Sequence, residues 1–546
     1  MRTLLLAAAL LATPASADTL IDNVNGLQVD AKGRLQKFTG LWIGSDGKVV
    51  RLLGAKDARP KRVGTRIDGR GRAMLPGLID AHGHVIGLGE AALTLDLDGT
   101  TSLAELQQRL KDYAAAHPGT GWIEGGGWNQ ERWPTKRFPT AADLDAVVAD
   151  RPVMLQRVDG HALVANSAAM RAAGVTPQTP VPSGGAIDQG LFVDNAMPLI
   201  EAKIPTATSA ERDSRLAKSL EILRGYGLTA TADMGTLPAD WAAMQRAGGR
   251  GELTTRIMSY GAGMTGAKAI SADGPTAWLH RDRLKFEGVK LYTDGALGSR
   301  GAWLKAPYAD KPDTRGLQFH SDADYGAMVT DAARRRYQIA THAIGDAADA
   351  QVIGAFEQLA KTYGTDRRWR IEHAQVLDPV DISRLARAGI IASMQPVHQT
   401  SDRTMAEARL GPNRLAGAYA WRSIAATGVR LAFGSDFPVE SPNPFPGIAA
   451  AVSRQDPQGR PPGGWRPEER VTLAQALGGF TREAAYAGFA EDRIGSLDPG
   501  KWADFIIVDR DIASASPTDI AATKVIETWI AGRKVFDASA AAPPAR

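Results

Sequence analysis

Two histidines separated by a single glycine, His82 and His84, close an apolar run at residues 73–85. In an extended strand alternate side chains share a face, so both rings would point the same way while Gly83 leaves the backbone uncrowded. Neutral imidazole nitrogens bind borderline metals such as zinc, and this spacing lets both rings reach one ion. The alternative is a chance pair on a surface strand, so the motif predicts a metal clamp only if further ligands accompany it.

Apolar, strand-like runs alternate with helical patterns over most of the chain, which favours βα units and a parallel sheet. Eight such runs can be counted, at residues 75–85, 229–234, 254–260, 286–295, 338–346, 369–375, 390–398 and 430–439. Eight βα units close into a barrel whose active site lies at the C-terminal ends of its strands. The pattern predicts an α/β fold, a distorted (β/α)8 TIM barrel over residues 73–489.

Residues that can ligate a metal stand in or at the ends of these runs. They are His82 and His84 in the first run, Lys290 in the fourth, His342 in the fifth, His373 in the sixth and Asp436 in the eighth. The whole chain has nine histidines, and four of them would meet at one rim of the barrel. Random placement would not gather them there, so the further ligands of the clamp are predicted at this rim.

These segments resemble the amidohydrolase superfamily of metal-dependent hydrolases. The resemblance rests on DAHGH, VKLYTDGALGSR, THAIGDAA, RIEHAQ and GSDFPV, and it covers nearly all of the chain after residue 17. GGGWN, DGHALVANSAAM and MQPVH are similar to the amidohydrolase-3 branch, which includes N-substituted formamide deformylase-like proteins. The resemblance implies hydrolysis of a C–N bond in a small amide, such as an N-acyl or N-formyl amine or amino-acid derivative.

The resemblance also implies how the ligands divide between two ions. His82, His84 and Asp436 would hold the more buried ion, and His342 and His373 would hold the second. Zinc is the expected divalent metal, with one or two ions per chain, although iron, manganese or cobalt suit the same ligands.

Lys290 would be carboxylated by CO₂ and bridge the two ions. A protonated amine cannot ligate, whereas a carbamate offers two anionic oxygens, and two nearby cations would favour the neutral amine that CO₂ must attack. The alternative is an unmodified Lys290, either paired with Asp294 or pointing away from a single-metal site.

Asp436 is in addition the expected proton carrier. The two ions would polarise the substrate carbonyl and lower the pKa of a bridging water toward neutrality. Asp436 would accept the proton of that water and pass it to the leaving nitrogen, because an amide anion leaves poorly. Sites of this kind elsewhere in the superfamily hydrolyse cyclic amides, carbamates or esters. Similarity to exoenzyme regulatory proteins leaves a non-catalytic, metal-binding role open.

Further candidates for substrate contact are His161, His398, Trp128 and Arg300. His161 could donate a hydrogen bond to the substrate or cap the helix that follows it, and His398 would face the barrel mouth from the seventh run. Trp128 and Trp133 offer an apolar wall, or else belong to the core of their own segment. Arg300 could bind an anionic group, the alternative being solvation at the surface.

Residues 86–228 separate the first two runs, and connections between βα units are usually short. They predict an inserted subdomain that caps the barrel mouth. Residues 18–72 and 490–546 carry β-branched runs broken by turn dipeptides such as Asp46-Gly47. They predict one small β-sandwich built from both termini, with two unrelated edge hairpins as the alternative.

The first 17 residues have the pattern of a secretory signal peptide, with Arg2, a short apolar run and the triplet Ala15-Ser16-Ala17. Cleavage is expected after Ala17, and the run is shorter than the roughly 20 residues that span a bilayer. The absence of cysteine suits an oxidising compartment without proving one. We expect a periplasmic or secreted protein with no membrane span.

The net charge is only +4, and Lys and Arg are scattered rather than clustered. This distribution does not predict nucleic-acid binding. The expected partner is a small-molecule substrate, and a homodimer is compatible with the sequence.

Overall fold

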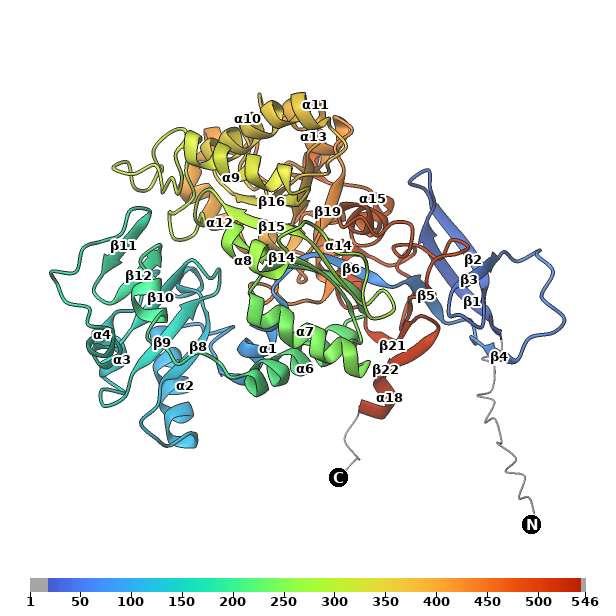
Figure 1. Ribbon diagram of the computed structural model, residues 1–546, viewed down its shortest axis with the longest axis horizontal. Helices are drawn as coiled ribbons and strands as arrows, with labels where there is room; N and C mark the ends of the chain where they lie inside the picture. Colours follow the sequence, from blue (N-terminus) through green and yellow to red (C-terminus); the bar gives the residue numbers. More distant parts are fainter. Residues whose placement is uncertain (1–17, 542–546) are drawn as a thin grey trace, which may run out of the picture.

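A computed structural model describes residues 18–541 of the 546-residue chain, where three β-sheets carry the architecture (Figure 1). The predicted signal peptide, residues 1–17, lies outside the described residues. In the described part of the chain, no helix combines the length and the apolar character that crossing a membrane requires.

The central sheet has eight parallel strands in the order β19-β18-β17-β16-β15-β14-β13-β6. Their bounds are β6 Leu78–Gly83, β13 Leu228–Thr236, β14 Arg256–Ala262, β15 Leu284–Tyr292, β16 Gln338–Ala343, β17 Arg370–His373, β18 Ile391–Met394 and β19 Leu431–Phe433. Nearly every residue of these strands is buried, as expected for parallel strands that are covered on both faces. Each of the eight predicted runs overlaps one of these strands.

The first and last strands of this sheet meet at the rim, where the sheet closes. Gly83 forms a parallel bridge with Phe437, and the backbone N–H of Asp436 donates to the carbonyl of His82 at 2.7 Å. A side chain at residue 83 would collide with the ring of Phe437, which explains the glycine between the two histidines. The sheet is therefore a nearly closed barrel, as predicted, and its closure places two ligand segments side by side.

Helices follow the barrel strands and cover them. Their bounds are α1 Val85–Leu93, α6 Ser209–Gly225, α7 Pro238–Arg250, α8 Gly263–Ile270, α9 Asp322–Arg334, α10 Asp346–Tyr363, α11 Ile382–Ala388, α12 Pro396–Leu410, α13 Trp421–Ala426, α14 Pro444–Ser453, α15 Leu473–Gly479 and α16 Arg482–Ala487. Several begin at a side-chain cap, such as Thr208 of α6, which forms a capping box with Glu211.

The segment inserted after β6 contains a six-stranded sheet in the order β11-β12-β10-β9-β8-β7. Its strands are β7 Leu95–Asp96, β8 Ile123–Trp128, β9 Val153–Arg157, β10 Ala162–Ala165, β11 Gly185–Asp188 and β12 Leu191–Asp194, and its helices are α2 Leu103–Ala116, α3 Ala141–Asp145, α4 Ser167–Ala173 and α5 Pro198–Glu201. Two hydrophobic clusters of its own pack around this sheet. In Figure 1 the insert lies on the opposite side of the barrel from β1–β4.

Strands from both ends of the chain form one eight-stranded sheet in the order β22-β21-β20-β5-β1-β2-β3, with β4 paired to β1. The bounds are β1 Thr19–Val29, β2 Leu35–Ile43, β3 Val49–Leu53, β4 Thr65–Asp68, β5 Ala73–Pro76, β20 Phe505–Val508, β21 Val525–Ile530 and β22 Arg533–Asp537; α17 Pro517–Ala521 and α18 Ala538–Ala541 accompany them. The junction is antiparallel pairing of β5 with β20. The two terminal segments thus share one sheet. That this sheet forms a β-sandwich of two layers stays a prediction.

Candidate metal centre

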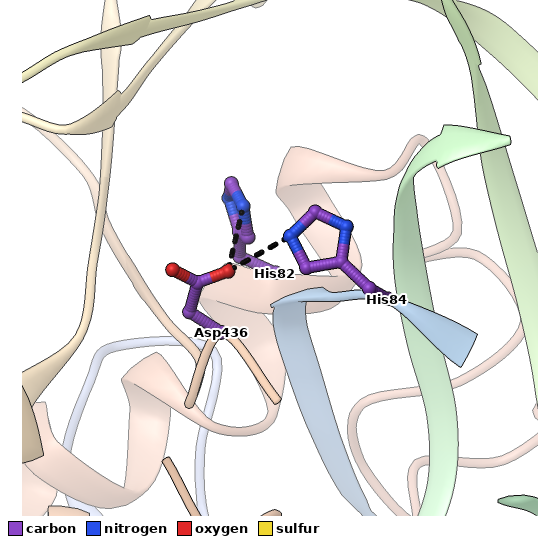
Figure 2. Close-up of side chains that lie close together, drawn as sticks. All are labelled: His82, His84 and Asp436. Carbon is purple, nitrogen blue, oxygen red and sulfur yellow. Dashed lines mark hydrogen bonds and ion pairs between the residues drawn. The ribbon is translucent and has the colours of Figure 1, made fainter. Parts of the chain in front are cut away.

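His82 and His84 converge on the carboxylate of Asp436 at the closed rim of the barrel (Figure 2). Nε2 of His82 and Nε2 of His84 lie 3.3 and 3.0 Å from Oδ1 of Asp436. The three ligand atoms lie within 4.8 Å of one another, a spacing that one ion can share. Two imidazole nitrogens and a carboxylate oxygen are a donor set that zinc and similar divalent metals prefer.

The backbone around these ligands is held by a buried carboxyl group, Asp80, for which the sequence analysis assigned no role. Its Oδ1 accepts the N–H of His82 at 3.0 Å, and its Oδ2 accepts the hydroxyl of Ser435 at 2.6 Å. Asp436 itself has a left-handed backbone, with φ of 62°. Such strained positions persist only where the surroundings fix them, and Asp80 supplies that constraint by joining β6 to the segment after β19.

A second group of possible ligands shares Asp436. The ligand atoms of His373, His398 and Asp436 lie within 4.8 Å of one another. The ring of His342 lies 4.6 Å from the ring of His373, centroid to centroid, but His342 belongs to neither group of ligand atoms. The structure therefore brings all four predicted histidine ligands to one rim and adds His398 to them.

The protonation states of these histidines suit metal binding. Burial lowers the pKa of His82 to about 4 and lowers the pKa of His342 and His373 well below its ordinary value. All three rings are therefore neutral near pH 7, the form that ligates a metal. Burial would raise the pKa of Asp436, but His82, His398 and His84 outweigh it and hold that pKa well below its ordinary value.

Lys290 lies in β15 within the same cluster, with Nζ 3.2 Å from Nε2 of His82. Burial lowers the pKa of Lys290 to about 8, which makes its neutral amine more accessible. Within residues 18–541 the ammonium group forms no ion pair. Asp294 instead accepts backbone N–H groups of Trp303 and Gly345, both at 2.8 Å, so the alternative pairing of Lys290 with Asp294 is absent.

A buried network of hydrogen bonds and an ion pair, which the sequence analysis missed, holds the His82 ring from the side away from the ligand cluster. Oε2 of Glu372 accepts a hydrogen bond from Nδ1 of His82 at 2.6 Å, so Nε2 is the nitrogen that faces the ligand cluster. Arg370 forms an ion pair with Glu372 at 2.7 Å and donates to the hydroxyl of Ser393 at 2.8 Å. Carboxylates that orient ligand histidines in this way strengthen metal binding.

Replacing Glu372 with glutamine is expected to weaken metal binding by about 10- to 100-fold, because the amide cannot fix the His82 tautomer as an anion does. Loss of the buried partner of Arg370 should also lower the free energy of unfolding by about 3 kcal/mol or more. Metal affinity measured by chelator competition on folded protein tests this. The control is Glu357→Gln, which breaks a half-exposed ion pair with Arg384, and unchanged affinity in Glu372→Gln would contradict the role.

Two cavities meet at this cluster, and the turn between β9 and β10 lies at their junction. The deep lobe is the cavity lined by Glu131, Arg157, His398, Asp402 and Glu440, among others. The insert lobe is the cavity lined by His84, Glu90, Glu124, Gln156 and Lys290, among others. Both lobes are lined by His161, His342, His373 and Asp436, so a molecule in either lobe would lie against the ligand cluster.

His161 is the residue through which the insert reaches the cluster. It precedes β10, its Nδ1 lies 2.6 Å from Oδ1 of Asp194, and its ring lies 5.0 Å from the ring of His342, centroid to centroid. The cap of the following helix α4 is Asn166, so His161 is not that cap. His398 lines the deep lobe between two carboxylates, Asp436 and Glu440, each 3.5 Å away.

Two predicted substrate contacts lie elsewhere. Trp128 is fully buried in the core of the insert, where its indole N–H donates to the carbonyl of Leu155 at 2.8 Å, and Trp133 is buried in the same cluster. Arg300 forms an ion pair with Asp310 at 2.9 Å. None of the three lines either lobe.

Similarity to known proteins agrees with this geometry. “Putative amidohydrolase YtcJ” of Bacillus subtilis is 32% identical over 512 residues, covering 90% of this chain and 95% of that protein. The “N-substituted formamide deformylase” of Arthrobacter pascens is 25% identical, covering 94% and 97%. The crystal structure of an uncharacterized metal-dependent hydrolase from Pyrococcus horikoshii superposes with a TM-score of 0.75 at 27% identity, covering 92% and 99%. A sequence profile described as “Amidohydrolase family” matches residues 65–536, and this chain belongs to that family of metal-dependent hydrolases.

Proposed function

We propose that this hydrolase cleaves the C–N bond of a small amide, such as an N-acyl or N-formyl amine or amino-acid derivative. The observation that supports it best is the convergence of His82 and His84 on Asp436, with His373 and His398 on the other side of the same carboxylate. The name of the Arthrobacter relative, a formamide deformylase, points to the same type of bond.

The donor set fits a divalent ion, because neutral imidazoles and an ionised carboxylate share a small buried volume. His82, His84 and Asp436 would hold one ion, and His342 and His373 would hold a second with a carboxylated Lys290 between them. The ions would polarise the scissile carbonyl and lower the pKa of water. Zinc is the proposed metal.

Asp436 is the proposed proton carrier. Its Oδ1 faces His82 and His84, while its Oδ2 faces His398 at 3.5 Å. An ionised carboxylate at this position accepts the proton of an attacking water and returns it to the leaving nitrogen. Without that proton the amine would have to leave as an anion. Asp436 therefore serves both proton transfers, the one from water and the one to the leaving nitrogen.

His161 and His398 are the proposed contacts to the substrate. His161 lines both lobes, so a hydrogen bond from its ring can reach a carbonyl or carboxylate of a substrate that lies across the ligand cluster. The Asp194 carboxylate at 2.6 Å raises the pKa of His161 against the effect of burial, which favours a ring that donates.

Turnover of paired amide and ester substrates that carry the same acyl group tests the bond type. We expect hydrolysis of the amide with release of the amine, because Asp436 can protonate a leaving nitrogen. Cyclic amides and carbamates belong in the same substrate panel, because the same type of metal site could hydrolyse them as well. Turnover of the ester alone would contradict the proposal while leaving the metal-dependent hydrolase intact.

The proposal places the enzyme in the periplasm or outside the cell. The sequence of residues 1–17 supports this location, with its short apolar run and small residues before Asp18.

A further inference from the structure

A cavity at the N-terminal end of the barrel strands gathers basic side chains, and we call it the basal pocket. Its lining includes Asp46, His280, Arg281, Arg283, Trp502 and Arg533. Arg283 directly precedes β15, whose opposite end carries Lys290, so the basal pocket and the metal centre lie at opposite ends of the barrel. Turns of the terminal sheet, at residues 43–47 and 531–533, form its other wall.

Three arginines line this pocket without a side-chain partner in the described part of the chain. Within residues 18–541, the side chains of Arg281, Arg283 and Arg533 form no ion pair and no hydrogen bond. Nη1 of Arg283 is buried and still lacks an acceptor. Buried polar atoms in proteins are almost always hydrogen-bonded, so this nitrogen can take an acceptor that residues 18–541 do not supply.

The carboxylates nearest to these arginines are already engaged by other groups. Asp504 accepts two hydrogen bonds from Arg256, at 2.7 and 2.9 Å. Oδ2 of Asp282 accepts Nη1 of Arg493 at 2.8 Å and the indole N–H of Trp502 at 2.9 Å. Both carboxylates therefore hydrogen-bond to other groups and not to the three arginines of the pocket.

The side chains that line the pocket carry more positive than negative charge. Asp46 is exposed at the rim, where its Oδ1 accepts the backbone N–H of Lys48 at 3.0 Å. The ammonium of Lys48 and the guanidinium of Arg256 lie 5.3 and 5.2 Å from the ring of Trp502. Nε2 of His280 donates a hydrogen bond to Oε1 of Gln245 at 2.7 Å. Asp46 is thus the one carboxylate that lines the pocket, beside Arg281, Arg283 and Arg533.

The surroundings of Arg283 lower its pKa. Burial contributes most, Arg256, Arg281 and Arg533 lower the pKa further, and Asp504 partly opposes them, which leaves the pKa at about 10. The guanidinium remains protonated near pH 7, so the pocket holds positive charge that no ion pair of Arg283 within the described residues balances.

We propose that the basal pocket binds a phosphate group, either as inorganic phosphate or as a phosphomonoester. Guanidinium groups present planar pairs of N–H donors that match phosphate oxygens, and a doubly charged group suits three free cations better than a single carboxylate does. The bound phosphate would join Arg281 and Arg283 of the barrel to Arg533 of the terminal sheet. It would thereby tie the two ends of the chain to the base of the barrel.

Isothermal titration of the metal-loaded full-length enzyme with inorganic phosphate, at constant ionic strength set with chloride, tests this site. We expect a Kd at or below about 1 mM for the basal pocket. Arg283→Met is expected to weaken this binding at least tenfold, and the double variant Arg281→Gln, Arg533→Gln, which changes exposed side chains, is expected to do the same. The control is Arg171→Met, an exposed arginine of α4 in the insert.

If phosphate binds only at the metal centre, the wild type and both pocket variants will bind it with the same Kd. That result would overturn the proposal. A parallel titration with glycerol phosphate distinguishes the source, because tighter binding than inorganic phosphate identifies a phosphomonoester. Arg283→Met should raise the Tm in phosphate-free buffer, since it removes an unpaired, partly buried cation. A lower Tm would show that Arg283 stabilises the unliganded chain and would contradict the proposal.

Discussion

Hydrolysis is expected to fall by about 10³-fold or more when Asp436 is replaced with asparagine. The amide keeps the size of the side chain and one carbonyl oxygen toward His82 and His84, so most of the metal should remain bound. It cannot accept a proton from water or return one to the leaving nitrogen. The measurement is kcat/KM on an amide substrate beside metal content and Tm of the same preparation.

The matched control for Asp436→Asn is Asp349→Asn. Asp349 is also buried, but neither of its carboxyl oxygens has a hydrogen-bond partner among residues 18–541, and burial raises its pKa well above the ordinary value. Asp349 belongs to neither group of possible metal ligands, so asparagine at this position should have little effect on turnover. Survival of most activity in Asp436→Asn would show that another group carries the proton.

Replacing Lys290 with methionine is expected to remove one of two bound ions and to lower turnover by at least about 100-fold. Methionine fills a similar volume but cannot form the carbamate that would join the ions. Labelling with ¹³C-bicarbonate gives an independent readout: the wild type should show a carbamate carbon signal, and Lys290→Met should not. The control is Lys285→Met, at the other end of the same strand β15.

Two results would contradict the bridging role of Lys290. Absence of the carbamate signal from the wild type would show that Lys290 is unmodified. Equal metal content in wild type and Lys290→Met would show that the side chain is not a ligand. Either outcome would leave His82, His84 and Asp436 as the centre of a single-metal site.

The barrel could be predicted from sequence because its strands are buried on both faces and therefore appear as uninterrupted apolar runs between turn signals. The ligands could be placed because parallel strands bring their C-terminal ends to one rim. His82, His373 and Asp436 meet there in the structure as the topology requires.

The supporting groups could not be placed in the same way. Glu372 and Arg370 alternate within a buried strand, a pattern that indicates a partner for each charge, but the sequence does not show that His82 is that partner. Whether Trp128 faces a cavity or the core of its own sheet depends on register and packing that only the fold decides. The basal pocket combines segments around residues 45, 282 and 532, whose proximity has no local signature.

The measurement that tests the central claim most directly is the number of metal ions per chain, by elemental analysis of protein purified with bicarbonate present. The arrangement of His82, His84, His342, His373 and Asp436 with a carboxylated Lys290 predicts two divalent ions. One ion would restrict the site to His82, His84 and Asp436 and contradict the bridged pair. No bound metal, even after reloading, would contradict metal-dependent hydrolysis by this chain.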